Sequence, residues 1–220
     1  MAQPNAMKLV ASIFVAPDDD ELRRVVSDAL IDRADPWGEL IGLQLAIAEK
    51  RGTTEIRKRA AELVKAHITT FAGPIAKVAS TLARKKSLVF EKGFLSEVEL
   101  DRRLVPRPAW EAAARAPHWA TVRRVRLSIL TTPLWWITKW IANPAATRSL
   151  RIIDVSGMQL ERATLAGPWT VTKTGGAKFF GANLAAIARG LPRAERARIA
   201  FAPKIATKHR LMHEAALQKV

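Results

Sequence analysis

The sequence contains no cysteine and no tyrosine among its 220 residues. The lack of cysteine excludes a disulfide, a thiol nucleophile, an iron–sulfur cluster and any zinc site with a cysteine ligand. An apolar run of the ~20 residues that a bilayer requires is also missing, because the most apolar window, 127–142, contains Pro133 and Lys139. Residues 1–8 do not combine a charged leader with a long apolar stretch, so we predict no secretory signal and expect a soluble, cytoplasmic protein without a membrane partner.

Common catalytic and ligand-binding motifs are missing as well. The sequence has no G-x-S-x-G nucleophile elbow and no nucleotide-binding fingerprint. His209 and His213 stand four residues apart, as a helical metal pair would, but no third ligand accompanies them. The Thr-Gly-Gly-Ala-Lys segment at 174–178 does not have the spacing of a phosphate-binding loop. We therefore predict a protein that is not an enzyme, with no metal, no cofactor and no small-molecule substrate.

Positive charge is abundant but unevenly distributed. The formal net charge is +16, yet residues 1–50 hold five Lys/Arg against nine Asp/Glu. The segments 51–86 and 189–219 hold nine and eight Lys/Arg, each against two glutamates. Such segments are typical either of a solvated surface or of nonspecific nucleic-acid binding through counterion release. For the second, alternative function, the candidate contacts are Arg57, Lys58, Arg59, Arg84, Lys85 and Lys86.

The first 86 residues predict a series of four helices. Asp18 is the expected N-cap of the second helix, because three acidic residues follow it and would face the positive end of the helix dipole. Its predicted buried face consists of Leu22, Val25, Val26, Ala29 and Leu30. Asp35-Pro36 is expected to start the next helix, and Gly73-Pro74 is expected to end the one after it.

The N-terminal segment also carries a more specific pattern. Its residues are Ala16-Pro17-Asp18-Asp19-Asp20, Arg23, Asp28, Leu30, Asp35-Pro36, Gly38-Glu39, Ile41 and Leu43-Gln44. Over about residues 12–51 they resemble the bacterial repeat-companion domain, with Val26, Ala29 and Ala34 in place of the family's tyrosine, tryptophan and glycine. Members of that family occur in large paralogous sets in myxobacteria and planctomycetes, beside repeat domains. The resemblance implies a helical module next to a repeat domain and implies no activity.

From residue 88 onward, three runs share the pattern aliphatic-x-x-aliphatic-x-aliphatic. They are 95–100, 122–127 and 150–155, at offsets of 27 and 28 residues, with helix-like segments between them. A fainter fourth run, 199–201, follows after an insertion near 165–181. This spacing and pattern resemble leucine-rich repeats, although the family's asparagine is replaced by Arg103, Leu130 and Met158. We predict a short, irregular solenoid with a parallel sheet.

The residues between the aliphatic positions are the first candidates for partner binding. Glu97, Glu99, Arg124, Arg126 and Asp154 would lie on the exposed face of neighbouring parallel strands and alternate in sign. The structural interpretation is a cross-strand ladder of ion pairs, each worth at most ~1 kcal/mol. The functional interpretation is a charged recognition face for a protein partner or a larger assembly.

Trp135, Trp136 and Trp140 form a second candidate group at helical spacing. They either pack beneath the sheet or anchor a partner on the surface.

Taken together, the patterns predict an α+β repeat protein. A repeat-companion-like helical module (1–51) and a helical connector (52–87) would cap a leucine-rich-repeat-like solenoid (88–220) that ends in a C-terminal helix. The predicted function is non-enzymatic protein binding or scaffolding through the repeat surface.

Overall fold

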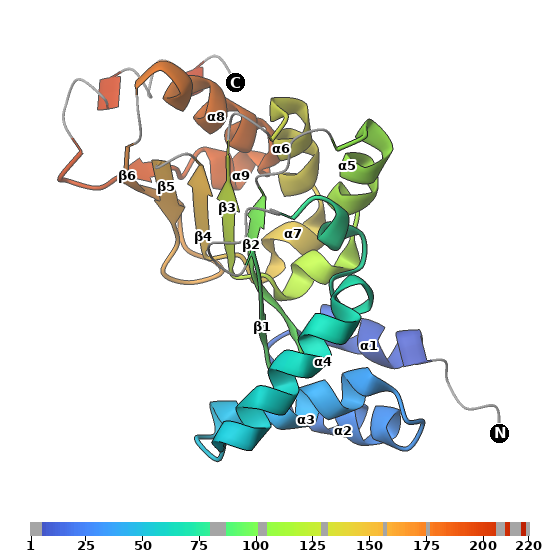
Figure 1. The fold of residues 1–220 in the computed structure, drawn as a ribbon. Helices are drawn as coiled ribbons and strands as arrows, with labels where there is room; N and C mark the ends of the chain where they lie inside the picture. The colour runs from blue at the N-terminus through green and yellow to red at the C-terminus, as the bar shows by residue number, and fades with distance from the viewer. Residues whose placement is uncertain are drawn as a thin grey trace.

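The structure is a computed structural model that describes residues 6–79, 87–100, 105–128, 132–155, 158–174, 177–205, 210–211 and 217–218. It confirms an α+β chain, in which helices come first and strands and helices then alternate (Figure 1). The predicted C-terminal helix and the predicted contacts Arg84, Lys85 and Lys86 lie wholly or largely outside the described residues.

Helices make up the N-terminal part, and three of them, at 20–31, 36–48 and 54–72, begin at side-chain caps. The elements are α1 (Ala6–Val15), α2 (Asp20–Ile31), α3 (Pro36–Ala48), α4 (Thr54–Ala72) and the 3-10 helix η1 (Gly73–Lys77). The N-cap of α2 is Asp19, one residue after the predicted Asp18, and its carboxylate accepts a hydrogen bond from the Leu22 N–H. The helix α3 starts at Asp35-Pro36 as predicted: Pro36 occupies its first turn, and the Asp35 carboxylate caps it by accepting a hydrogen bond from the Trp37 N–H.

The buried face of α2 differs from the predicted one. Val26 and Leu30 are buried, but Val25 is 57% exposed and Arg23 is buried in its place. The Arg23 guanidinium donates to the Pro17 carbonyl and to Asp20, and it lies 5.8 Å from the centre of the Phe94 ring. These partners compensate for the cost of removing the guanidinium charge from water. The spacing of apolar residues alone does not predict such a buried charge.

The described strands form one sheet in the order β1-β2-β3-β4-β5-β6-β7, which is also their order along the chain. Their bounds are β1 (Leu88–Glu91), β2 (Phe94–Leu100), β3 (Arg124–Leu127), β4 (Ile152–Val155), β5 (Met158–Glu161), β6 (Thr170–Lys173) and β7 (Ala200–Phe201). The three predicted runs are β2, β3 and β4, and they pair in parallel. Val98, Val125 and Ile153 lie in one row, in the register of the sequence alignment.

The sheet as a whole is mixed, so the prediction of a parallel sheet is correct only in part. The β1-β2, β4-β5 and β5-β6 pairs are antiparallel. Only two residues separate Glu91 from Phe94, and only two separate Val155 from Met158, which is too short for a parallel crossover. The segment 165–181, predicted as an insertion, contributes β6 to the sheet and the first residues of a helix. The predicted fourth run, β7, pairs in parallel with β6.

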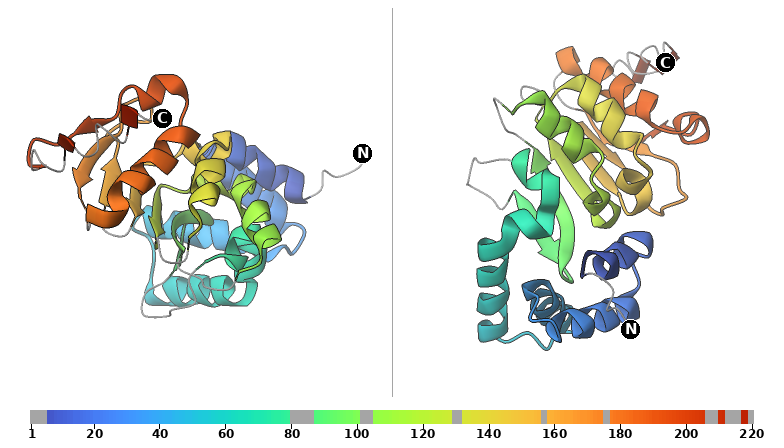
Figure 2. Two further views of the ribbon diagram at one scale, coloured as in Figure 1. Left: turned by 90° about the horizontal axis from the view of Figure 1, so that it is seen from above. Right: turned by 90° about the vertical axis from the view of Figure 1, so that its right-hand side faces the viewer.

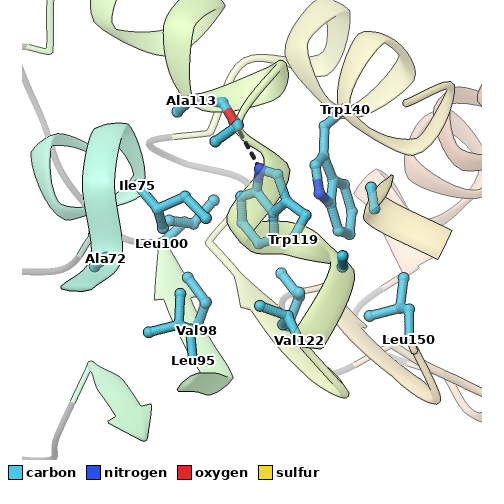
Figure 3. Close-up of a cluster of buried hydrophobic side chains, with 14 of the residues drawn as sticks. Ala72, Ile75, Leu95, Val98, Leu100, Ala113, Trp119, Val122, Trp140 and Leu150 are labelled. Carbon is cyan, nitrogen blue, oxygen red and sulfur yellow. Dashed lines mark hydrogen bonds between the residues drawn. The ribbon is translucent and has the colours of Figure 1, made fainter. Parts of the chain in front are cut away.

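Helices from the connections cover one face of the sheet (Figure 2). They are α5 (Arg107–Ala114), η2 (Pro117–Thr121), α6 (Leu134–Ile141), α7 (Pro144–Arg148), α8 (Ala177–Gly190) and α9 (Arg193–Arg196). Val98 and Leu100 point from β2 toward Trp119, whose indole N–H donates to the Ala113 carbonyl at 2.6 Å (Figure 3). The buried side chains of the N-terminal helices and of the sheet belong to one continuous core.

The N-terminal helices hold the turn of the β1-β2 hairpin. The Trp37 indole N–H donates to the Gly93 carbonyl at 2.8 Å. The Gln44 side chain donates to the Phe90 carbonyl at 3.1 Å and accepts from the Gly93 N–H at 2.7 Å. Lys92 and Gly93 both have positive φ, 51° and 85°, as a two-residue hairpin turn requires. Figure 1 shows β1 and β2 reaching down from the sheet to α3.

His118 lies at the same junction. It is 5% exposed, its ring centre is 5.1 Å from that of Phe14, and it stacks on Trp37 at 6.4 Å. Neither ring nitrogen has a hydrogen-bond partner among the described residues. Burial lowers the pKa of His118 from 6.5 to about 4, so the imidazole is neutral at pH 7.

Replacing Gly93 with alanine is expected to destabilise the fold. A Cβ at this position would lie 2.2 Å from Ile41 Cγ1 and 2.8 Å from Ile41 Cα, at a φ of 85°. The combined backbone strain and overlap predict a loss of about 2–4 kcal/mol in the free energy of unfolding, measured by chemical denaturation. Gly167→Ala is the control, because its Cβ would meet chiefly Thr164 in a loop. Equal effects of the two substitutions would contradict the importance of the turn.

His118 is expected to make the fold sensitive to acid. The unfolded chain binds a proton at this residue near pH 6.5, whereas the folded chain binds it only near pH 4. The stability contribution is therefore complete above about pH 6.5 and is lost as the pH falls toward 4, by about 3 kcal/mol in total. Denaturation of His118→Leu over this pH range should show a flatter dependence than the wild type. An equal pH dependence in His118→Leu and in the wild type would contradict this assignment.

Candidate partner-binding face of the sheet

The second face of the sheet carries polar side chains that alternate with the buried ones. Its members lie on β2 to β6 and are all partly exposed: Glu97, Glu99, Arg124, Arg126, Ile152, Asp154, Gln159, Glu161, Thr170 and Thr172. We call this set the open face. It includes all five strand residues predicted from the sequence, because the parallel register brings β2, β3 and β4 together as the alignment required.

Ion pairs connect β2 and β3 on the open face. Arg124 Nη1 lies 3.4 Å from Glu97 Oε1, and the two guanidinium nitrogens of Arg126 lie 3.4 Å from Glu97 Oε2 and 3.8 Å from Glu99 Oε2. Glu99, Arg126 and Asp154 occupy one row across the three strands. These four β2 and β3 side chains are 28–39% exposed, so solvent still reaches the charges. The predicted ladder is therefore present between β2 and β3, and its atoms are accessible to a partner.

The open face differs in charge from the rest of the chain. It holds four acidic and two basic residues, a net charge of −2, in a protein of +16, and the exposed Lys173 opposite Gln159 borders it. Ile152 is its one aliphatic residue, between Arg124 on β3 and Glu161 on β5. An apolar centre with a charged rim is the usual composition of a protein–protein contact. A surplus of carboxylates disfavours contact with phosphates.

Sequence reasoning missed Gln159, Glu161, Thr170 and Thr172, which extend the open face over β5 and β6. The Gln159 side chain donates to Glu161 at 2.6 Å. A signal for β5 was present, because Val155-Ser-Gly-Met158 places two turn-forming residues between two apolar ones. The short β6 strand has no comparably strong pattern.

The tryptophan cluster divides between core and surface. Trp136 and Trp140 are fully buried and stack at 5.5 Å, so the packing interpretation holds for these two and the surface-anchor interpretation is wrong for them. The Trp136 indole N–H donates to the Trp110 carbonyl at 2.7 Å. Trp135 is 37% exposed on the outer side of α6, away from the sheet. Their spacing fits a helix whose inner face packs on the core, which is why only one of the three indoles reaches the surface.

The basic residues predicted on α4 are exposed, but one of them has an acidic partner. Arg59 donates to both carboxylate oxygens of Glu39, at 2.6 and 2.7 Å. The hydrogen bond from Arg59 lowers the pKa of the Glu39 carboxyl. Arg57 and Lys58 share the first two turns of α4 with Glu55. The part of this basic segment that the structure describes is therefore partly neutralised.

Two open hollows lie elsewhere on the described surface. One of about 570 Å³ lies between the α2-α3 turn and α4 and is lined by Asp35, Glu39, Arg59 and His67, among others. The other, of about 770 Å³, lies between η1 and α5 and is mainly apolar. Among the described residues no three His, Asp or Glu side chains come together as metal ligands would. No helix of the described part combines the length and apolar character needed to cross a bilayer.

Comparisons of the chain with models of protein families, with curated proteins and with solved structures found no match. The function is therefore inferred from the geometry of the chain itself.

The ion pairs of the open face are expected to contribute little to stability. Exposed pairs at 3.4 Å or more have a modest Coulomb energy and hold long side chains in place at an entropic cost. A double-mutant cycle with Glu97→Gln and Arg126→Gln should give a coupling free energy below about 1 kcal/mol in chemical denaturation. A coupling of several kcal/mol would show that these ion pairs mainly stabilise the fold.

Proposed function

We propose that the chain is a non-enzymatic protein-binding module. Its N-terminal helices would act as a repeat-companion-like cap on a short, irregular leucine-rich-repeat-like solenoid, and the open face would bind a protein partner or a larger assembly. The proposal includes the cytoplasmic location expected from the sequence and requires no metal, cofactor or small-molecule substrate.

The spacing of the parallel strands supports the repeat interpretation. Aligned positions on β2, β3 and β4 are 27 and 28 residues apart, and each connection includes helical turns on the same face of the sheet. The parallel pair of β6 and β7 has an offset of 30 residues, from Thr170 to Ala200, with α8 and α9 between them. Three strand–helix–strand connections of nearly equal length support a repeated unit.

The contacts of the N-terminal helices support the cap. Gln44 and Ile41 belong to the pattern that resembles the repeat-companion domain, and both contact the hairpin turn at Gly93. Ala34 has a φ of 53° at the position where that family has glycine. Covering the first hairpin of the sheet is the role that a terminal cap has in a solenoid.

The observation that carries the functional proposal is the open face itself. Among the described elements, helices cover one face of the sheet, while the other presents ten partly exposed side chains in five adjacent strands. Rows of side chains at fixed spacing give a rigid surface whose binding requires little ordering. Its charge pattern would select a partner and fix its orientation.

The alternative from the sequence is nonspecific nucleic-acid binding by the basic segments. The open face has a net charge of −2, and Arg59 on α4 is paired with Glu39. Neither the open face nor α4 is therefore favoured as a nucleic-acid site. The basic segment that begins at Arg189 lies elsewhere, at the end of α8 beside α6, so neither observation applies to it.

Inverting the charges of the open face should abolish partner binding without unfolding the protein. The variant combines Glu97→Arg, Glu99→Arg, Arg124→Glu, Arg126→Glu and Asp154→Arg, so that each ion pair is kept with its sign reversed. A partner would first be captured with the wild type from nuclease-treated lysate of the native host, identified and purified. We expect its affinity for the inverted variant to fall at least about 10-fold, with an unchanged circular dichroism spectrum.

The matched control inverts an exposed ion pair between α3 and α4, with Glu39→Arg and Arg59→Glu. This control should bind the purified partner like the wild type. Retained binding by the inverted open face would refute the assignment of the site. Loss of all captured proteins on nuclease treatment would refute protein binding as the function.

A further inference from the structure

Trp135 is an exception among the tryptophans of this chain. The other six are at most 3% exposed, whereas Trp135 is 37% exposed at the start of α6. An indole on the surface offers apolar area and a π-face to another molecule.

Two cations lie against this ring. The Arg107 guanidinium carbon is 5.2 Å from the ring centre, and Lys139 Nζ is 5.6 Å from it. Glu111 is the nearby acid, 3.0 Å from Arg107 and 4.0 Å from Lys139. Both cations are more than half exposed, so they can also reach a ligand that lies on the indole.

A group of arginines lies at the end of the neighbouring helix. Arg189, Arg193 and Arg198 are exposed, and neither Arg189 nor Arg193 has an acidic partner among the described residues. The one acid of this stretch, Glu195, points inward, because its carboxylate lies 3.3 Å from the Trp169 indole nitrogen and 3.8 Å from the buried Arg162. The exposed charge at this corner is therefore positive.

The indole and the arginines lie on the same layer of helices. The Thr138 hydroxyl of α6 donates to the Ala186 carbonyl of α8 at 3.0 Å. Gly190 of α8 lies against Ile141 and the Thr138 carbonyl, so closely that a Cβ would overlap with them. Trp135 is one helical turn before Thr138, and Arg189 is next to Gly190. Helices α5 to α9 contain seven Lys/Arg and two Glu, a net charge of +5.

We propose that this outer helix surface binds single-stranded nucleic acid, with an unpaired base stacked on Trp135 and the phosphates on Arg107, Lys139, Arg189 and Arg193. An exposed aromatic ring between cations is the combination that single strands use, since every base offers a π-face and every linkage a negative charge. A duplex keeps its bases stacked internally and would leave the indole unused. The exposed apolar area, Leu134 and Trp135, is small for insertion into a membrane.

The probe is a fluorescein-labelled oligo(dT) of about 20 nucleotides, titrated with the full chain and followed by anisotropy at several salt concentrations. We expect the affinity to fall steeply as salt rises from about 50 to 200 mM. Arg189→Gln with Arg193→Gln should lower the slope of log K against log salt by about 1.4, because each phosphate that is no longer neutralised lowers it by about 0.7. Trp135→Leu should weaken binding by about 5- to 100-fold at fixed salt.

Two control variants separate this site from general attraction. Arg57→Gln with Lys58→Gln removes two positive charges from α4 and should change the affinity less than about 2-fold. Leu134→Ala removes the other exposed apolar side chain of α6 and should leave binding unchanged if the indole acts by stacking. Circular dichroism of each variant checks the fold. In the wild type, binding should protect tryptophan fluorescence from acrylamide, because Trp135 is its exposed source.

Three outcomes would overturn the proposal. The first is no binding of the oligonucleotide at low salt. The second is an equal decrease in affinity for the α4 and α8–α9 double variants with no decrease for Trp135→Leu, which would indicate charge alone. The third is that polyglutamate or phosphatidylserine vesicles bind more tightly than the oligonucleotide, which would assign the surface to an acidic protein or to a membrane. None of these measurements uses the protein partner proposed for the open face, so the two proposals are tested independently.

Discussion

Three hydrogen bonds from two side chains of α3 to the β1-β2 turn connect the helical and the sheet parts of this protein. Trp37 donates to Gly93, and the Gln44 amide makes two bonds to the backbone of the same hairpin. The turn can pack this closely on α3 because Gly93 has no Cβ that would overlap with Ile41. These bonds hold the hairpin turn at one end of the sheet against α3. The position of this hairpin sets the position of the strands that follow it.

With that end of the sheet fixed, the two sides of the C-terminal part differ in chemistry. The open face has a net charge of −2 and short rows of paired charges, whereas helices α5 to α9 have a net charge of +5 and carry the exposed Trp135. The screening length at physiological salt is about 8 Å, so each side acts on a ligand largely through its own charges. A chain with a strong overall charge can therefore present one surface suited to a protein and another suited to an anion.

Much of the sheet was predictable because its register depends on local patterns. The aliphatic rows through Val98, Val125 and Ile153 follow from an alternation that only one register can bury. Burial of Arg23 in place of Val25 was not predictable, since it depends on the Pro17 carbonyl in the loop before α2 and on the Asp20 carboxylate at the start of α2. The division of the tryptophan cluster was likewise decided by packing, because a helical spacing does not say how far the buried face extends.

The sequence by itself determined the α+β composition, the start of α3 at Asp35-Pro36, the three aligned strands and the charged residues between them, because these follow from short-range periodicity and turn chemistry. Only the tertiary structure decided which face of the sheet stays open, that β5 and β6 extend it, and that Trp135 is exposed while Trp136 and Trp140 are not. The reason is physical. Local patterns fix which side chains point together, but exposure depends on what distant segments bring against them.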